Sequence, residues 1–166
     1  MAKFNKIRKM DIANGPGVRV SIFMQGCPFH CKGCFNKETW DFNEGQDFTN
    51  NEIAEIINLA KDDYIKGLSI LGGEPLHPNT IEATKELAKA FKEKYPNKTI
   101  WLWTGYLFEN IPNKEALNYI DVLIDGQFKE ELHDPRLKWR GSSNQRVIDI
   151  QKTLKANKII LYESES

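Results

Sequence analysis

The chain has 166 residues and a balanced charge, with 23 Lys and Arg against 23 Asp and Glu. This length is sufficient for one domain with a hydrophobic core, and a formal net charge of zero gives no basic surplus that would favour nucleic acid or an anionic membrane surface. No apolar run is long enough for a membrane span, and the mostly polar N-terminal residues lack the apolar segment of a signal peptide. We therefore expect a single domain, covering residues 1–166, in the cytoplasm.

The first part of the chain predicts one strand that leads into a cysteine-rich loop. Residues 1–17 are polar and end in the turn signal Asn14-Gly15-Pro16-Gly17. Segment 18–25 is rich in β-branched and apolar residues and is predicted to be a strand. Segment 26–35 follows directly, and residues 36–48 show no clear period, so we expect a loop there.

Helices and strands alternate in the next part of the chain. A capping-box sequence at 49–52 precedes apolar residues at helical spacing, which predicts a helix of about four turns that ends at Gly67. A second helix is predicted to begin in the same way at 79–82 and to end before Pro96. A shorter helix is predicted at 113–119. Further strands are predicted at 68–71, 99–103 and 121–125.

This alternation predicts an α/β fold with parallel strands and crossover helices. Nearly continuous apolar strands, such as 68–71 and 122–124, fit a sheet covered on both faces, or a barrel wall. Trp101 and Trp103 lie two residues apart on a strand, so we expect them to share one face in the core. The remainder is less regular, with a loop predicted at 129–145 and two further strands at 146–150 and 158–162.

Every cysteine of the chain lies in one short segment, at the spacing C-x₃-C-x₂-C formed by Cys27, Cys31 and Cys34. An odd number of clustered cysteines argues against a disulfide framework and favours a metal in a reducing compartment. Thiolates suit iron–sulfur clusters and zinc, and three thiolates are one ligand short of a closed four-cysteine site. If they hold a cluster of four irons, one iron is open to an exogenous ligand.

The three cysteines admit two other interpretations. In the first, zinc takes His30 as its fourth ligand, although structural zinc sites usually draw their ligands from two separated pairs, and His30 is adjacent to Cys31. In the second, Cys31 and Cys34 form a redox dithiol, which leaves Cys27 without a role. Both remain less favoured alternatives at this point.

Each predicted strand of the alternating region ends in a loop with residues suited to a site. The carboxyl ends of parallel strands meet at one edge of a sheet, so these loops are expected to surround one mouth. In Gly72-Gly73-Glu74-Pro75, the glycines would let a ligand approach without a Cβ in the way, and Glu74 would accept hydrogen bonds from an ammonium group. Taken alone, this motif is also typical of a strand-to-helix turn. Thr104 and Asp125 follow the next two strands.

The cysteine motif and several later segments together resemble a known family. C-x₃-C-x₂-C followed by the aromatic Phe35 is similar to the signature of radical S-adenosylmethionine enzymes. Segments 14–19 and 72–75 resemble those of glycyl radical enzyme activases. Within that group, segments 101–106, 121–126 and 140–145 resemble the activating proteins of anaerobic (class III) ribonucleoside-triphosphate reductases.

The resemblance implies a partial (β/α) barrel of the radical S-adenosylmethionine type that holds a [4Fe-4S] cluster. Cys27, Cys31 and Cys34 would ligate three irons, and the amino and carboxylate groups of S-adenosyl-L-methionine would chelate the fourth. Some relatives carry Lys where this chain has Gln127, and we assign that residue no catalytic role. By matching motif, the residues implied to contact the cofactor are Gly33, Cys34, Phe35, Gly73, Glu74, Thr104 and Asp125.

The resemblance also implies an activity and partners. The enzyme would reductively cleave S-adenosylmethionine, and the resulting 5′-deoxyadenosyl radical would abstract hydrogen from a glycine of the large reductase subunit to form a glycyl radical. An external one-electron donor, such as a flavodoxin, is implied, and neither nucleic acid nor membrane is expected. The alternatives are an activase of another glycyl radical enzyme, of the pyruvate formate-lyase type, and a non-catalytic zinc-binding interaction module. Segment 151–166 extends beyond the shorter relatives and carries no motif that we can interpret.

Overall fold

One mixed sheet of seven strands organises the computed structural model, which describes residues 2–163. Across the sheet the strand order is β3-β1-β2-β4-β5-β6-β7. The central strands β2, β4, β5 and β6 pair in parallel, whereas β1, β3 and β7 add antiparallel strands at the two edges. In chain order the strands are β1 (Lys3–Asp11), β2 (Val18–Gln25), β3 (Gln46–Asp47), β4 (Ile65–Gly72), β5 (Thr99–Trp103), β6 (Val122–Asp125) and β7 (Arg146–Asp149).

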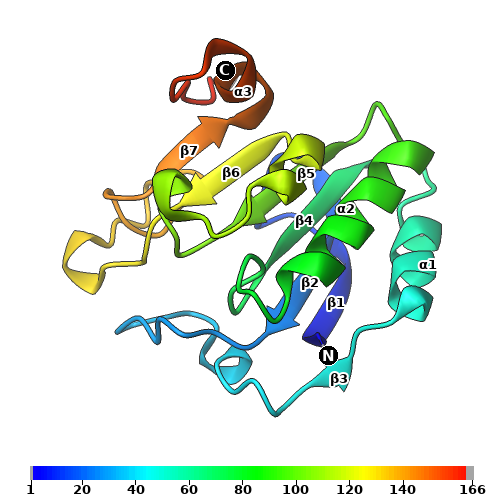
Figure 1. Cartoon of the computed structure of the whole chain (residues 1–166), viewed down its shortest axis with the longest axis horizontal. Helices are drawn as coiled ribbons and strands as arrows, with labels where there is room; N and C mark the ends of the chain where they lie inside the picture. Colours follow the sequence, from blue (N-terminus) through cyan, green and yellow to red (C-terminus); the bar gives the residue numbers. More distant parts are fainter. Residues whose placement is uncertain (1, 164–166) are drawn as a thin grey trace.

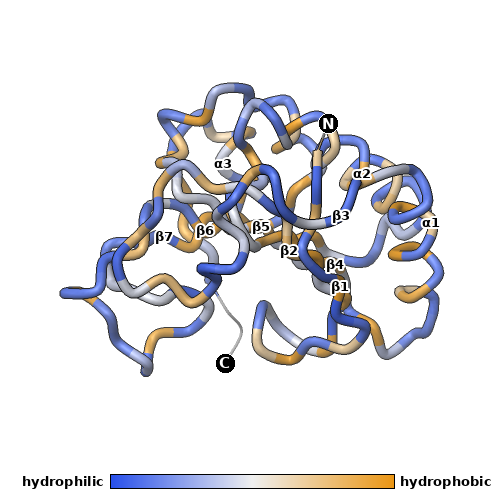
Figure 2. The backbone as a smooth tube through the Cα atoms, turned by 90° about the horizontal axis from the view of Figure 1, so that it is seen from below, coloured by the Kyte–Doolittle hydropathy of each residue, from blue (hydrophilic) through white to orange (hydrophobic). Residues whose placement is uncertain are grey.

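Three α-helices in the described residues lie on the same side of this sheet. They are α1 (Asn50–Leu59), α2 (Ile81–Lys94) and α3 (Ile150–Ala156). Figure 1 shows α1 and α2 beside the central strands and α3 at the β7 end, and Figure 2 shows all three helices on one side of the row of strands. The predicted α/β class with a parallel centre is confirmed, and the arrangement is consistent with the expected partial (β/α) barrel.

Side chains along the strands alternate between two apolar layers. Ile100 and Leu102 of β5 belong to the main core, which also contains the buried faces of α1 and α2. Trp101 and Trp103 belong to a second cluster on the opposite face, with Val122 and Ile124 of β6. The predicted common face for the two tryptophans is therefore confirmed.

Helix α1 begins as predicted but ends earlier. The Asn51 amide donates to Thr49 Oγ1 across 3.1 Å and the Thr49 amide donates to Glu52 Oε1 across 2.6 Å, which completes the capping box. The predicted end at Gly67 is wrong, because α1 ends at Leu59 and Gly67 lies inside β4. A Cβ at Gly67 would collide with the backbone carbonyl oxygen of Thr99 on the neighbouring strand, so this glycine serves strand packing and not helix termination.

The edges of the fold differ most from prediction. Segment 1–17 contains the strand β1, which is polar because it lies near the edge of the sheet, where seven of its nine residues are exposed or partly exposed. Segment 36–48 holds a 3₁₀ turn and β3, and 113–119 forms a 3₁₀ helix (Glu115–Tyr119) in place of an α-helix. Further 3₁₀ turns occur at Phe108–Asn110 and Glu130–Leu132.

Two more predictions need correction. Helix α2 begins at the predicted place, but its N-cap Thr80 makes no side-chain capping bond. The predicted strand at 158–162 is reduced to one antiparallel bridge between Ile148 and Leu161, and helix α3 precedes it. The last part of the C-terminal extension, 164–166, lies outside the described residues. Among residues 2–163, none of the helices has the length and apolar character needed to cross a bilayer.

Candidate active site

A cavity of about 550 Å³ lies at the carboxyl ends of the parallel strands. Loops from all four of these strands contribute to its wall, as the strand order predicts. The residues that line it from these loops include Cys27, Cys31, Cys34 and Phe35 after β2, Gly73 and Glu74 after β4, Thr104 and Gly105 after β5, and Gly126, Gln127 and Phe128 after β6.

The three cysteines are free thiols on one folded loop. Cys27 is buried, whereas Cys31 and Cys34 are half-buried. Burial raises the pKa of the Cys27 thiol to about 11, so the thiol is protonated at neutral pH. It becomes a thiolate ligand when metal binding displaces the proton. A turn closes the loop, because the Cys34 amide donates to the Cys31 carbonyl across 3.1 Å.

The ligand geometry does not favour a single zinc ion. His30 stacks on Trp40 with ring centroids 4.5 Å apart and does not line the cavity. In residues 2–163, no three His, Cys, Asp or Glu side chains are grouped as ligands of one metal ion. The thiols share a cavity without converging on one point, which suits a larger group better than a single ion.

Glu74 is held rigidly at the base of the cavity. Its side chain is 1% exposed, and it accepts hydrogen bonds from the Thr104 hydroxyl at 2.7 Å, the Gly105 amide at 2.6 Å and the Leu76 amide at 2.9 Å. Burial raises the pKa of this carboxyl to about 7, against the opposing effect of the three donors. Glu74 thus fixes the loops after β4 and β5 to each other.

The diglycine before Glu74 serves the packing of the chain, a role that the sequence interpretation missed. A Cβ on Gly73 would collide with the carbonyl oxygen of Gly26, and one on Gly72 would lie 2.5 Å from the Met24 amide nitrogen. The Glu74 amide donates to that same Gly26 carbonyl across 2.7 Å. These glycines let the loop after β4 press against the backbone of the cysteine loop.

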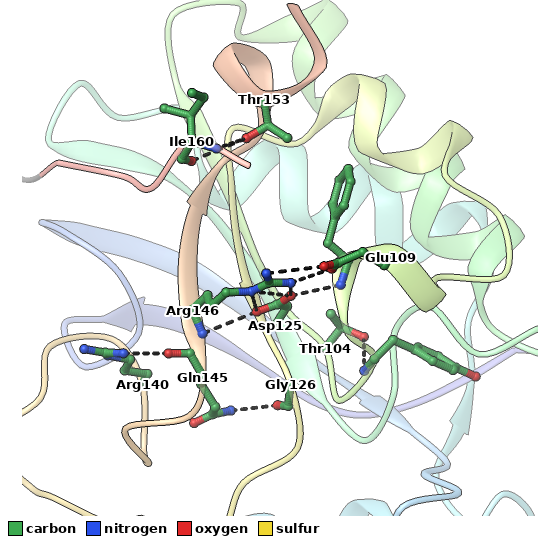
Figure 3. A network of polar contacts seen from close by, with 11 residues as sticks. Thr104, Glu109, Asp125, Gly126, Arg140, Gln145, Arg146, Thr153 and Ile160 are labelled. Carbon is green, nitrogen blue, oxygen red and sulfur yellow. Dashed lines mark hydrogen bonds and ion pairs between the residues drawn. The ribbon is translucent and has the colours of Figure 1, made fainter. Parts of the chain in front are cut away.

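Two predicted site residues do not line the cavity: Gly33, on the cysteine loop, and Asp125. Asp125 is fully buried, and Arg146 binds its carboxylate through Nε at 3.1 Å and Nη2 at 2.5 Å (Figure 3). The Phe108 amide also donates to Asp125, and Arg146 reaches Glu109 at 2.6 Å. Asp125 therefore anchors the segment that carries Gly126 and Gln127, and it does not line the cavity.

A second wall of the cavity was not identified from the sequence. It consists of residues on the strand faces and on loop 137–141, and periodicity gave no signal for it because β2 and β4 are almost wholly buried. Ser21 and Ser69, on the same strand faces, are fully buried. The residues of this second wall are Arg8, Phe23, Leu71, Trp103, Leu137, Trp139 and Arg140.

Arg19 closes the fold at the amino ends of the strands. It is fully buried, and its five N–H groups donate to Ser69 Oγ, Thr99 Oγ1 and the carbonyl oxygens of Pro16, Leu68 and Thr99. Burial lowers the pKa of its guanidinium to about 10, which still leaves it charged at neutral pH. Arg19 itself does not line the cavity, whereas Ala13 and Asn14 of the loop before β2 do.

Comparison with known proteins identifies the family. A family model described as "4Fe-4S single cluster domain" matches residues 13–148. The anaerobic ribonucleoside-triphosphate reductase-activating protein of Enterobacteria phage T4 is 44% identical over 144 residues, which is 87% of this chain and 92% of that protein. Proteins of the same name from Vibrio cholerae and Escherichia coli K12 are each 43% identical over 148 residues, covering 87% of this chain and 96% of theirs. The chain belongs to the anaerobic ribonucleoside-triphosphate reductase-activating proteins.

The donor set of this activating protein fits a [4Fe-4S] cluster. Thiolates are the usual ligands of such clusters, and Cys27, Cys31 and Cys34 are the only thiols of the chain. All three line the same cavity and are free. The matched residues 13–148 include the whole cysteine loop, and the zinc-module alternative is not supported.

Proposed function

We propose that the protein activates an anaerobic ribonucleotide reductase by radical S-adenosylmethionine chemistry. Cys27, Cys31 and Cys34 would hold three irons of the [4Fe-4S] cluster, and S-adenosylmethionine would bind at the remaining iron. The observation that carries this proposal is that the three thiols share one cavity with Gly73, Glu74 and the neighbouring loops. The relatives, all anaerobic ribonucleoside-triphosphate reductase-activating proteins, support the same target.

Six of the predicted residues are proposed to hold the cofactor. Gly73 and Glu74 present the loop after β4 to the cavity, and Thr104 presents the loop after β5. These loops are bonded to one another through Glu74, so the side of the cofactor next to them meets preorganised donors and acceptors. Cys34 and Phe35 line the opposite side, on the cysteine loop, and Gly33 precedes them on that loop. Asp125 is proposed to act as a positioning residue, through the segment that it anchors.

When bound, the cluster and S-adenosylmethionine supply a one-electron reductive cleavage that leads to hydrogen-atom abstraction from a glycine. The chain itself contributes alignment and a dry environment. Glu74 is almost inaccessible to solvent, and Phe23, Leu71 and Trp103 give the second wall an apolar surface. Such a wall excludes water from the reacting groups.

The partners are inferred from this chemistry. The large catalytic subunit of the reductase would supply the glycine, and a one-electron donor such as a flavodoxin would supply the electron. A polypeptide substrate needs an open site, and half-buried Cys31 and Cys34 leave the cysteine side of the cavity accessible. Three free thiols agree with the reducing cytoplasm as the proposed location.

The experiment is to reconstitute the cluster anaerobically, reduce the protein chemically and measure 5′-deoxyadenosine in the presence of S-adenosylmethionine. The proposal predicts product from the unsubstituted protein and none from Cys31→Ala, which lacks a cluster ligand. A full complement of about four irons per chain, with no product, would contradict it. Methionine release, measured in the same samples, confirms that the carbon–sulfur bond is the one that breaks.

A further inference from the structure

The proposed function requires a polypeptide glycine to reach the cavity, and the cysteine loop at its mouth is partly exposed. Beneath the cavity, Arg19 and Ser69 are fully buried and Trp101 is 1% exposed. At the carboxyl ends, Phe35 is 67% exposed beside the half-buried cysteines. A partner segment therefore approaches over the side of the cavity that carries Phe35.

Aromatic and aliphatic side chains gather on this side, in what we call the rim cluster: Phe35, Phe128, Leu132 and the imidazole ring of His133. The rings of Phe35 and Phe128 lie 5.2 Å apart, and His133 lies 5.5 Å from Phe35 and 5.6 Å from Phe128. Leu132, next to His133, is 39% exposed. Because Phe35 and Phe128 also line the cavity, the apolar surface is continuous from the exterior to the site.

The rim cluster is supported by a well-bonded backbone. The Ser143 amide donates to the Leu132 carbonyl across 3.0 Å, and the Lys129 amide donates to Ser142 Oγ across 3.1 Å. Gly141 packs directly under the rings, since a Cβ there would lie 2.8 Å from Phe128 and 3.3 Å from Phe35. A preformed surface of this kind loses little conformational freedom when a partner binds.

The charges around the rim cluster favour apolar docking. The exposed neighbours are of both signs, Lys32 and Lys129 against Glu130 and Glu131. A small electron-transfer encounter is typically steered by a field of one sign, which mixed charges do not provide. Exposed aromatic and aliphatic anchors surrounded by polar residues are typical of more stable interfaces between proteins.

We propose that the rim cluster is the docking surface for the glycine-bearing subunit of the reductase. An apolar side chain of that subunit, near its glycine, packs against Leu132 and the rings, and this contact directs the glycine into the cavity. The inference rests on the proposed function and adds to it the surface by which the substrate protein is recognised.

The test compares Leu132→Glu with Leu154→Glu, a control on α3 whose wild-type side chain is also 39% exposed. Affinity of the cluster-loaded protein for the large subunit is measured anaerobically, and partner-free cleavage of S-adenosylmethionine is measured in parallel. We expect Leu132→Glu to bind the subunit about tenfold or more weakly, with unchanged partner-free cleavage. Leu154→Glu should match the unsubstituted protein in both assays, and His133→Ala should weaken subunit binding in the same direction as Leu132→Glu.

Unchanged affinity in both Leu132→Glu and His133→Ala would overturn the inference. A normal affinity with slower reduction of the cluster by a flavodoxin would also overturn it, because the surface would then belong to the electron donor. Loss of partner-free cleavage in both variants would assign the rim to the cofactor site and overturn it as well. Failure of the unsubstituted protein to cleave S-adenosylmethionine would instead refute the proposed function, and the inference with it.

Discussion

The hydroxyl of Thr104 donates a 2.7 Å hydrogen bond to Oε2 of Glu74, and so joins the loop after β5 to the loop after β4. Glu74 completes the connection by accepting from the Gly105 amide. The cavity floor is therefore a bonded unit built from two strands that are neighbours in the sheet. The stability of this floor, unlike the binding role of the rim cluster, is testable in the cluster-free protein.

The first prediction concerns the pH dependence of stability of the cluster-free protein. Burial raises the pKa of Glu74 from its ordinary 4.5 to about 7, so the folded state retains a proton that the unfolded chain has released. The stabilisation by this proton is complete below about pH 4.5 and is lost as the pH rises through 7. Urea unfolding should show a steeper fall in the free energy of unfolding between about pH 5 and pH 8 for the unsubstituted protein than for Glu74→Gln. Equal slopes would contradict the assignment.

The second prediction separates two glycines of the site. Gly73→Ala should lower the free energy of unfolding by about 2 kcal/mol or more, because its Cβ would meet the backbone of Gly26. Gly126→Ala should cost about 1 kcal/mol, because the nearest atom is 3.7 Å away and only the φ of +94° is unfavourable. Thermal unfolding of the cluster-free variants measures both. Equal stability of the Gly73→Ala and Gly126→Ala variants would contradict the close packing of the loop after β4 on the cysteine loop.

The third prediction concerns the buried ion pair of Asp125. Arg146→Met leaves a fully buried carboxylate without its guanidinium, which should destabilise the fold by about 3–5 kcal/mol. The double variant Asp125→Asn/Arg146→Met should recover part of this loss, because no charge is then left unpaired. Denaturant titration of the two single variants and the double variant measures the free energy of unfolding of each, and so the coupling between the two residues. Additive effects of the two substitutions would show that the pair does not anchor the segment.

The fourth prediction concerns Arg19. Arg19→Lys keeps the charge but leaves buried acceptors on Ser69 and Thr99 without donors, so we expect a loss of about 3 kcal/mol in the free energy of unfolding. The exposed Arg136, whose guanidinium donates to Asp134 in its own turn, gives the control Arg136→Lys, for which we expect no measurable change in the free energy of unfolding. A similar small change for both would indicate that the network around Arg19 contributes little.

The sequence predicted the part of the fold that surrounds the site. The strands β2, β4, β5 and β6 are rich in apolar and β-branched residues, and that signal does not depend on tertiary contacts. The sequence prediction failed at the edges of the sheet, where β1 is polar. It also failed at Gly67, whose role is set by Thr99 on a neighbouring strand.

The site was predictable to a similar degree. Loop positions after the strands were sufficient to gather Cys27, Glu74 and Thr104, because strand order alone fixes which loops share an edge. Asp125 also lies at the carboxyl end of a strand, but Arg146 binds its carboxylate. Arg146 lies 21 residues later in the sequence, on the antiparallel strand β7, so this contact could not be predicted. Leu137 and Trp139 were missed because nothing in an irregular loop indicates that these side chains line a cavity.

The central claim is that this protein places a radical on a glycine of the reductase. The most direct measurement is the EPR spectrum of the large reductase subunit after anaerobic incubation with the reduced, cluster-loaded protein and S-adenosylmethionine. We predict a glycyl radical doublet, with formation of 5′-deoxyadenosine, that is absent when Cys27→Ala, Cys31→Ala or Cys34→Ala replaces the unsubstituted protein. Formation of 5′-deoxyadenosine without a doublet on this subunit, but with a doublet on a pyruvate formate-lyase, would contradict the claim.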